Sequence, residues 1–307
     1  MKKISIGADI GGSHISTMAV ELETGAMLQE TYSRVEVDSN GPAEEILQTW
    51  KSSLNASIRK SNRHLLTGLG FAMPGPFDYP NGIALFSGVQ KFESLYGINI
   101  RNEITSLTGI PDSMPVRFLN DATCFAIGEA WLGKASAFDR VIAITLGTGF
   151  GSAFLDHGVP VSTGNEVPEH GWVYHLPFGG SIADDCFSTR WFVKRYKEIT
   201  GRTINGVLEI SVTADQDAAA RRVFSEFGSN LGQFLAPLIR RFNAGCLVIG
   251  GSISQTYDIF HNPFLSGLAR EGIQDLPQYV SSMGENAAIA GSARLSDNEF
   301  YRTMATH

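Results

Sequence analysis

Two glycine-rich turns, each placed between two apolar runs, constrain this sequence more than any other feature. The first turn contains Gly11-Gly12, and the second is Leu146-Gly-Thr-Gly149. Apolar runs bounded by turn residues predict β-strands. The predicted strands are residues 4–9 and 15–22 around the first turn, and residues 140–145 and 150–155 around the second. Because the strand, turn, strand pattern occurs twice, we infer that the chain is internally duplicated.

Strands and helices alternate after each predicted hairpin, which indicates an α/β fold. The predicted helices include residues 122–132, 182–197, 215–241 and 287–295. A chain of 307 residues is long enough for two domains. We expect a small N-terminal α/β domain at residues 1–118, completed by residues from about 288 to 307, and a larger C-terminal α/β domain at residues 119–287.

Composition excludes several other classes of protein. The 24 basic and 31 acidic residues give a net charge of −7, and no Lys/Arg-rich run is present, so we expect no nucleic-acid partner. No apolar run approaches the ~18 residues of a membrane span, so no membrane partner is expected. Cys124, Cys186 and Cys246 are odd in number and far apart, which favours reduced thiols. The expected location is the cytoplasm.

Asp9 and the turn that follows it are the first candidate site. Glycines let backbone N–H groups approach phosphate oxygens, and the Asp9 carboxylate has the chemistry to orient a hydrated Mg²⁺ ion. The alternative is an ordinary hairpin with an Asx-stabilised turn. A third glycine turn, Gly250-Gly251, follows the apolar run at residues 246–249. Three such turns in one chain favour nucleotide binding over the alternative.

Asn120-Asp121 is the second candidate site, because it lies where a predicted strand meets a predicted helix. Asp121 is a candidate general base, which needs an ionised carboxylate within hydrogen-bond reach of a substrate hydroxyl. Asn and Asp are also favoured helix N-caps, and position alone does not decide between the two roles.

Two common nucleotide motifs are absent. Gly128-x4-Gly133-Lys134 nearly matches a P-loop, but Ala135 replaces the Ser/Thr that holds Mg²⁺, and the preceding residues predict a helix rather than a strand. No complete Gly-x-Gly-x-x-Gly occurs either. Any nucleotide must therefore be held in another way.

Five motifs, in their order along the chain, resemble those of the ROK family, named for repressors, open reading frames and kinases. They are Asp9-Ile-Gly-Gly-Ser-His14, Gly70-Phe-Ala-Met-Pro-Gly-Pro-Phe-Asp78, Asn120-Asp-Ala122, Leu146-Gly-Thr-Gly-Phe-Gly151 and Ile249-Gly-Gly-Ser-Ile253. The resemblance implies the actin-like ATPase fold, with two domains and a cleft between them. It also implies ATP- and Mg²⁺-dependent phosphorylation of a hexose or N-acetylhexosamine. Members of the family are commonly homodimers.

The resemblance assigns a role to each motif. Asp121 is similar to the catalytic base, and Asn120 to a sugar ligand. Asp9 is similar to the acid that orients magnesium. The expected nucleotide contacts are Gly11, Gly12, Ser13, Thr148 and Gly149 at the phosphates, and Gly250 and Gly251 at the adenosine.

One segment departs from the family pattern. Family members usually show Glu-x-Gly-His and then a cysteine cluster that binds zinc, whereas this chain has Glu169-His-Gly-Trp172 and only Cys186. One cysteine cannot supply three thiolates, so we expect no zinc. Glu169 is expected to remain a sugar ligand, with His170 substituting for the missing histidine and Asp184 for the second sugar-binding acid. Trp172 is expected either to stack on a sugar or to pack.

A second functional hypothesis is a catalytically silent sugar-binding or regulatory protein, because the family includes sugar-responsive repressors. Those repressors carry an N-terminal winged helix, and here the first predicted strand begins by Ile4. The candidate base Asp121 and both phosphate turns are present, which favours the kinase.

Overall fold

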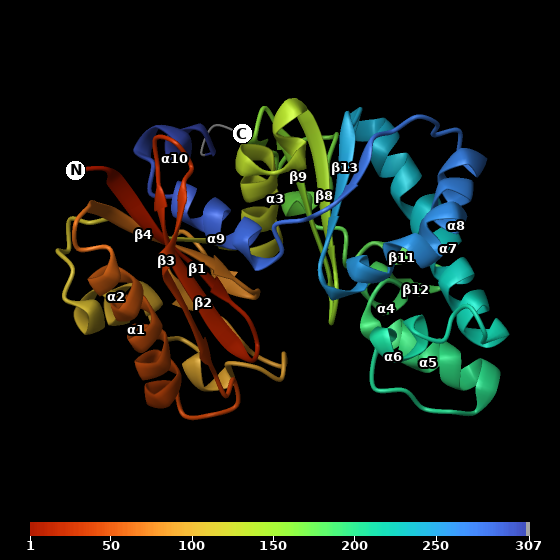
Figure 1. Cartoon of the computed structure of the whole chain (residues 1–307), viewed down its shortest axis with the longest axis horizontal. Coiled ribbons are helices and arrows are strands. Elements are labelled where there is room, and N and C mark those ends of the chain that lie inside the picture. Colours follow the sequence, from red (N-terminus) through yellow and green to blue (C-terminus); the bar gives the residue numbers. More distant parts are fainter. Residues whose placement is uncertain (305–307) are drawn as a thin grey trace. The chain divides into compact units, whose positions relative to one another are not determined.

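The computed structural model describes residues 1–304, and the chain forms two compact units. The first unit comprises Met1–Gly133 and the segment from Glu285 onward, and the second comprises Lys134–Gly284. Figure 1 shows the elements of both units. No helix in the described part of the chain is both long and apolar enough to cross a membrane.

The first unit is built on a five-stranded sheet in the order β3-β2-β1-β4-β7. Its strands are β1 (Lys3–Ile10), β2 (His14–Glu21), β3 (Met27–Glu36), β4 (Leu65–Met73) and β7 (Val116–Asn120). The first three form an antiparallel meander that contains the hairpin predicted around the glycine turn, while β4 and β7 run parallel to β1. The parallel strands therefore end at one edge of the sheet, and this edge carries the first candidate site.

Alternate residues of β1 face two different helix layers, because side chains alternate along a strand. Ile4 and Ile6 pack in a core with Trp50 of α1 (Ala43–Lys60), whereas Gly7 lies directly against the backbone of Ile289 in α9 (Glu285–Arg294). The first unit also contains further helices and a short β-hairpin. The elements are α1 (Ala43–Lys60), β5 (Phe77–Asp78), β6 (Ile83–Ala84), η1 (Glu93–Leu95), α2 (Ile100–Thr108), α3 (Asp121–Leu132), α9 (Glu285–Arg294) and α10 (Asn298–Met304).

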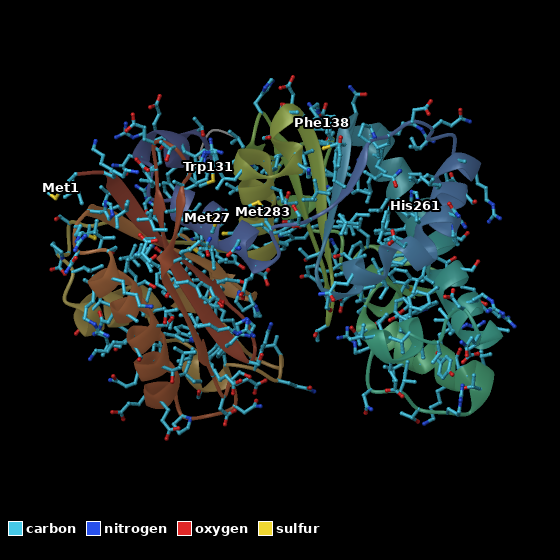
Figure 2. All side chains as sticks on the ribbon, viewed as in Figure 1. Met1, Met27, Trp131, Phe138, His261 and Met283 are labelled. Carbon is cyan, nitrogen blue, oxygen red and sulfur yellow. The ribbon has the colours of Figure 1, made fainter. Side chains whose placement is uncertain are left out.

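Helices α3 and α9 approach each other closely through glycines. Gly128 of α3 lies against the backbone of Ala287, and Gly291 of α9 lies against the backbone of Cys124. A Cβ at either position would overlap a carbonyl oxygen, so glycine permits the close approach. Trp131 of α3, labelled in Figure 2, packs against a small apolar cluster that β2 and α9 form together. The last predicted helix, residues 287–295, thus packs closely through its small residues.

The second unit repeats the architecture of the first with a sheet in the order β10-β9-β8-β13-β14. Its strands are β8 (Arg140–Leu146), β9 (Phe150–Asp156), β10 (Val159–Pro160), β13 (Cys246–Gly250) and β14 (Gln278–Val280). As in the first sheet, three strands form an antiparallel meander and two are added in parallel to its first strand. The inferred internal duplication is confirmed by this shared strand order.

The helices of the second unit form its apolar core with the sheet. Its remaining elements are η2 (Lys134–Ala137), η3 (Glu169–Gly171), β11 (Pro177–Phe178), β12 (Ser181–Ile182), α4 (Ala183–Cys186), α5 (Thr189–Thr200), α6 (Val207–Ser211), α7 (Ala218–Phe242), η4 (Ser252–Thr256) and α8 (Tyr257–Arg270). The single helix predicted at residues 182–197 is wrong. Ser188 is extended, with φ −125° and ψ 169°, because the next residue, Thr189, donates its N–H to the second glycine turn.

The boundaries between the two compact units follow Gly133 and Gly284 in the sequence. The boundary expected near residue 118 assigns α3 to the other domain, whereas α3 packs against α9 within the first unit. The two units are defined by packing alone, so the division into functional domains at residues 118 and 287 stays a prediction. Residues 305–307, which belong to the predicted N-terminal domain, lie outside the described chain.

Candidate functional site

Asn120 and Asp121 lie at the junction of β7 and α3. The Asn120 side chain caps the helix, because its Oδ1 accepts the N–H of Thr123 at 3.2 Å. Its Nδ2 also donates to Asp121 Oδ1 at 3.0 Å, and the N–H of Ala122 donates to the same oxygen at 2.8 Å. No other described residue donates to the second oxygen, Asp121 Oδ2. The carboxylate is thus oriented through one oxygen and available through the other.

Asp9 lies at the same edge of the sheet, near the end of β1. Burial, the carboxylate of Asp121 and the carboxylate of Glu285 together raise the pKa of Asp9 to about 7. Burial also raises the pKa of Asp121. Like charges in a low-dielectric place disfavour ionisation, so this edge favours either a bound proton or a cation.

The turn after Asp9 has open backbone donors. Gly11 closes it by donating its N–H to the carbonyl oxygen of His14 at 2.9 Å. Gly12 and Ser13 are exposed, and among the described residues nothing accepts a hydrogen bond from their N–H groups. Neighbouring free N–H groups of this kind form an anion-binding concavity.

Glu285 is a residue of this region that sequence analysis did not find. Its Oε1 accepts the hydroxyl of Tyr32 at 2.7 Å, and its Oε2 accepts the hydroxyl of Ser16 at 2.9 Å and Arg34 Nη1 at 3.1 Å. His14 Nε2 lies 3.4 Å from the same oxygen. Burial opposes ionisation of Glu285, but the hydrogen bonds from Tyr32 and Ser16 and the charges of Arg34 and His14 together lower its pKa. These bonds fix the first residue of α9 to two strands of the sheet.

The second glycine turn is held by the first residues of α5. The N–H and the hydroxyl of Thr189 donate to the carbonyl oxygen of Gly147 at 2.8 and 3.0 Å, and Arg190 Nη1 donates to that of Thr148 at 3.0 Å. With these carbonyl groups occupied, the N–H groups of Thr148 and Gly149 have no acceptor among residues 1–304. The turn therefore offers two amides to an anion.

Asp184 belongs to this turn by its contacts. Its Oδ1 accepts the N–H of Phe150 at 2.7 Å, and its Oδ2 pairs with Arg190 Nη2 at 2.5 Å. Both carboxylate oxygens thus help to hold the second turn. The role of Asp184 as a sugar ligand stays a prediction.

Gly250 and Gly251 follow β13 directly. Gly251 has a φ of +85°, and a Cβ there would overlap the backbone of Leu146, where the second glycine turn begins. Glycine is required for this close approach. The structure thus places the third turn next to the second within the same unit, while its contact with adenosine stays a prediction.

Buried and more exposed residues alternate from His170 to Tyr174 in the predicted sugar-binding segment. Gly171 and Val173 are buried and held by the hydroxyl of Ser152, which donates to the Gly171 carbonyl oxygen at 2.7 Å and accepts the Val173 N–H at 3.0 Å. His170 and Trp172 lie on the other side, with their ring centroids 4.7 Å apart. Trp172 is half-buried, whereas the side chains of its neighbours are open to solvent, and those neighbours are Glu169, His170 and Tyr174.

No group of three or more His, Cys, Asp or Glu residues within the described chain is arranged to hold a metal ion. Cys186 Sγ lies 3.6 Å from the carbonyl oxygen of Phe178 instead. The zinc content of the protein stays a prediction.

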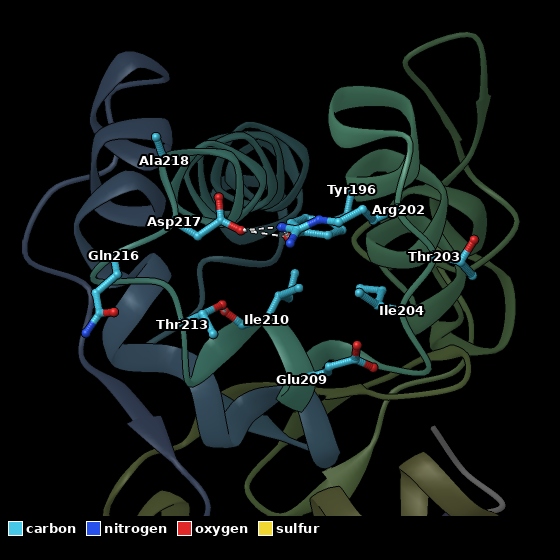
Figure 3. Close-up of a pocket in the computed structure, with 10 residues that line it drawn as sticks. All are labelled: Tyr196, Arg202, Thr203, Ile204, Glu209, Ile210, Thr213, Gln216, Asp217 and Ala218. Atoms are coloured by element: carbon cyan, nitrogen blue, oxygen red, sulfur yellow. Dashed lines mark hydrogen bonds and ion pairs between the residues drawn. The ribbon is translucent and has the colours of Figure 1, made fainter.

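A cavity of about 500 Å³ lies among the end of α5, α6 and the start of α7 (Figure 3). Asp217 Oδ2 accepts the hydroxyl of Tyr196 at 2.6 Å and pairs with Arg202 Nη2 at 3.1 Å across one side of it. None of the predicted site residues lines this cavity. Its lining has one basic residue, Arg202, against two acidic residues, Glu209 and Asp217, so it lacks the free positive charge that a phosphate site uses.

The duplicated fold, with a glycine turn in each unit, is the actin-like ATPase fold. The structure of a ROK hexokinase from Thermus thermophilus has the same fold, with a TM-score of 0.78, 20% identity, and coverage of 97% of this chain and 99% of that one. The ROK family model matches residues 5–299. The chain belongs to the ROK family.

Two relatives of this chain are named as kinases of sugars or glycosides. A glucokinase from Thermotoga maritima is 27% identical, over 94% of this chain and 96% of its own length. A beta-glucoside kinase from Klebsiella pneumoniae is also 27% identical, over 96% of both chains.

Proposed function

We propose that this chain is an ATP-dependent sugar kinase that phosphorylates a hydroxyl of a hexose or an N-acetylhexosamine. The observation that carries the proposal is the edge of the first sheet, where Asp121 keeps one carboxylate oxygen free beside Asp9 and an open glycine turn. The kinase names of the relatives at 27% identity support the reaction class.

Asp121 acts as the general base in this proposal. Its Oδ2 accepts the proton of the sugar hydroxyl, whose oxygen forms a bond to the γ-phosphorus of ATP. The bond from the γ-phosphorus to the β–γ bridging oxygen breaks, so the products are a sugar phosphate and ADP. The raised pKa of Asp121 strengthens it as a base, and the Asn120 amide keeps the carboxylate oriented.

The residues at this edge fit a magnesium ion. The neighbouring carboxylates that raise the pKa of Asp9 make positive charge favourable there. Asp9 would hold Mg²⁺ through the water ligands of the ion, which supplies positive charge to the ATP phosphates. Gly11, Gly12 and Ser13 offer their amides to phosphate oxygens.

The second unit would hold the rest of the nucleotide and the sugar. Thr148 and Gly149 provide amides for phosphates, and Gly250 and Gly251 are assigned to the adenosine. Glu169 and His170 are assigned to the sugar hydroxyls, because their side chains are exposed beside Trp172. Trp172 presents part of its ring as an apolar surface for a sugar face.

The test is ADP release from ATP and Mg²⁺ in the presence of hexoses, ketohexoses and N-acetylhexosamines, with each reaction paired to one that lacks sugar. We expect at least one sugar to raise ADP release far above the paired reaction. If no sugar does so, while calorimetry detects sugar binding, the silent sugar-binding protein replaces the kinase.

We also propose that the chain works as a cytoplasmic homodimer without nucleic acid. The net charge of −7 supports the last point, because an acidic protein repels a phosphate backbone. Light scattering on the purified protein measures the subunit number, and a monomer at all concentrations would contradict the dimer.

A further inference from the structure

Lys91 lies beside the first glycine turn, although no motif points to it. It is half-buried, and its Cδ is 3.8 Å from the position that a Cβ would take at Gly12. Its charge also acts on Asp121, because it lowers the pKa of that carboxyl against the effect of burial. One cationic side chain is thus near both the turn and the candidate base.

The backbone on both sides of Lys91 is in the left-handed region. Gln90 and Phe92 each have a φ of +58°. Residues with a side chain avoid this region, because the backbone is sterically strained there. Two of them around a single residue must be imposed by the surrounding structure.

Contacts of the flanking residues impose this conformation. Phe92 is fully buried, with its ring centroid 5.5 Å from that of Trp50 and 5.6 Å from that of Phe86. The N–H of Phe92 donates to the carbonyl oxygen of Ser39 at 2.6 Å. Gln90 is fixed as well, since its N–H donates to the Glu93 carboxylate at 3.0 Å. The loop is therefore pinned on both sides of Lys91.

The ammonium group of Lys91 makes no ion pair or hydrogen bond with residues 1–304. A half-buried lysine buries its stem and keeps its charged head accessible to a ligand. The ammonium group of Lys91 and the free N–H groups of the first glycine turn therefore lie close together on a fixed backbone. We infer that they bind an anion from a ligand, because no described residue provides one.

We propose that Lys91 is a catalytic residue, whose ammonium group contacts the γ-phosphoryl group during its transfer from ATP to the sugar. This inference rests on the proposed kinase function. The transferred group carries its negative charge on three equatorial oxygens in the transition state. A cation held in advance at that position stabilises the charge without reorganisation. Lys91 forms no bond in the step and exchanges no proton, so the reaction remains balanced as written above.

The test compares Lys91→Met and Lys91→Gln, which remove the charge, with Lys91→Arg, which keeps it. Loss of one such electrostatic contact lowers kcat by about 10²–10³-fold in other enzymes. We expect a loss of that scale in both neutral variants, an unchanged dissociation constant for sugar in calorimetry, and recovery of most of the activity in Lys91→Arg. Thermal melting shows which variants are folded.

The matched control is Lys3→Met, which removes an exposed lysine at the other end of β1. It should retain the wild-type kcat. A folded neutral variant at Lys91 with wild-type kcat would overturn the assignment while leaving the kinase function intact. A loss that Lys91→Arg does not recover would also overturn it, since the loop rather than the charge would then matter. Absence of turnover in the wild type would instead refute the proposed function itself.

Discussion

The glycine turn of the first unit lies among carboxylates, whereas the turn of the second unit is held by an arginine and a threonine. At the first turn, burial and the carboxylates of Asp121 and Glu285 raise the pKa of Asp9 to about 7. At the second turn, the carboxylate of Asp184 is paired with Arg190 at 2.5 Å. The two sheets have the same strand order, so the difference lies in the side chains that reach each turn.

This contrast suggests a division of labour between the units. Asp9 and Asp121, whose pKa values are raised, suit a place where a proton is taken up and where a cation is attracted. A turn whose carbonyl groups are fixed by other residues keeps its amides oriented, which suits the binding of a phosphate that does not react. We expect substitutions in the first unit to affect the chemical step and those in the second to affect nucleotide binding.

The largest effect is expected from Asp121→Asn. The amide keeps the shape of the side chain but accepts no proton, so kcat should fall by about 10²–10⁴-fold. Sugar binding, measured by calorimetry, should remain. Asp112→Asn is the control, since Asp112 is an exposed acid of the same unit. An Asp121→Asn enzyme within a few-fold of wild type would show that another group takes the proton.

Asp9→Asn should stabilise the free protein at high pH. The folded state binds a proton at Asp9 up to about pH 7, whereas the unfolded chain releases it near pH 3.8. The wild type therefore loses stability as pH rises through this window. The variant should be more stable at pH 8 by up to ~4 kcal/mol, from about three pKa units, and by less at pH 5.

Denaturant unfolding at the two pH values measures this difference. Asp217→Asn in the second unit supplies a comparison of opposite sign. The hydrogen bond from Tyr196 lowers the pKa of Asp217, so ionised Asp217 stabilises the fold at pH 8, and this contribution is lost as pH falls. If Asp9→Asn is no more stable than wild type at pH 8, burial and the neighbouring carboxylates do not raise the pKa of Asp9.

Arg190→Met should weaken ATP binding with little change in kcat. It removes the donor to the Thr148 carbonyl oxygen and the partner of Asp184. A net 0.5–1.5 kcal/mol per hydrogen bond predicts a KM for ATP that is about two- to tenfold higher. Arg222→Met removes another exposed, carboxylate-paired arginine of the same unit and should have no effect. A fall in kcat alone would contradict the division of labour.

The smallest effect is expected from metal chelation before ATP and Mg²⁺ are added. Cys186 alone remains of the family's cysteine cluster, so the purified protein should contain no stoichiometric zinc and should unfold at the same temperature after dialysis against a chelator. Elemental analysis checks the first point. One zinc per chain would show that residues 169–188 build a metal site in a different way.

The sequence predicts the backbone of both sites well. Short-range signals suffice for a glycine turn between two apolar runs, and for Asn120-Asp121 between a strand and a helix. The same local signals misplace one element. Residues 182–197 have a helical pattern, but a long-range bond from Thr189 to Gly147 breaks the helix at Ser188.

The side chains around the turns could not be predicted in the same way. Ser16 and Glu285 are 269 residues apart in the sequence, and no periodic pattern links them. Lys91 and Arg190 lie outside every motif, and only the folded loop and helix bring them to the turns. A carboxylate at position 184 could bind a sugar or hold the second glycine turn, and the sequence does not distinguish these two roles. The contacts of Asp184 with the turn become visible only in the structure.

The central claim is that this protein transfers the γ-phosphoryl group of ATP to a sugar hydroxyl. Phosphorus NMR of the wild type with ATP, Mg²⁺ and the sugar that most stimulates ADP release tests it directly. We predict a sugar phosphate resonance that grows at the same rate as ADP, and no inorganic phosphate. ADP accompanied by inorganic phosphate, with no sugar phosphate, would contradict the account.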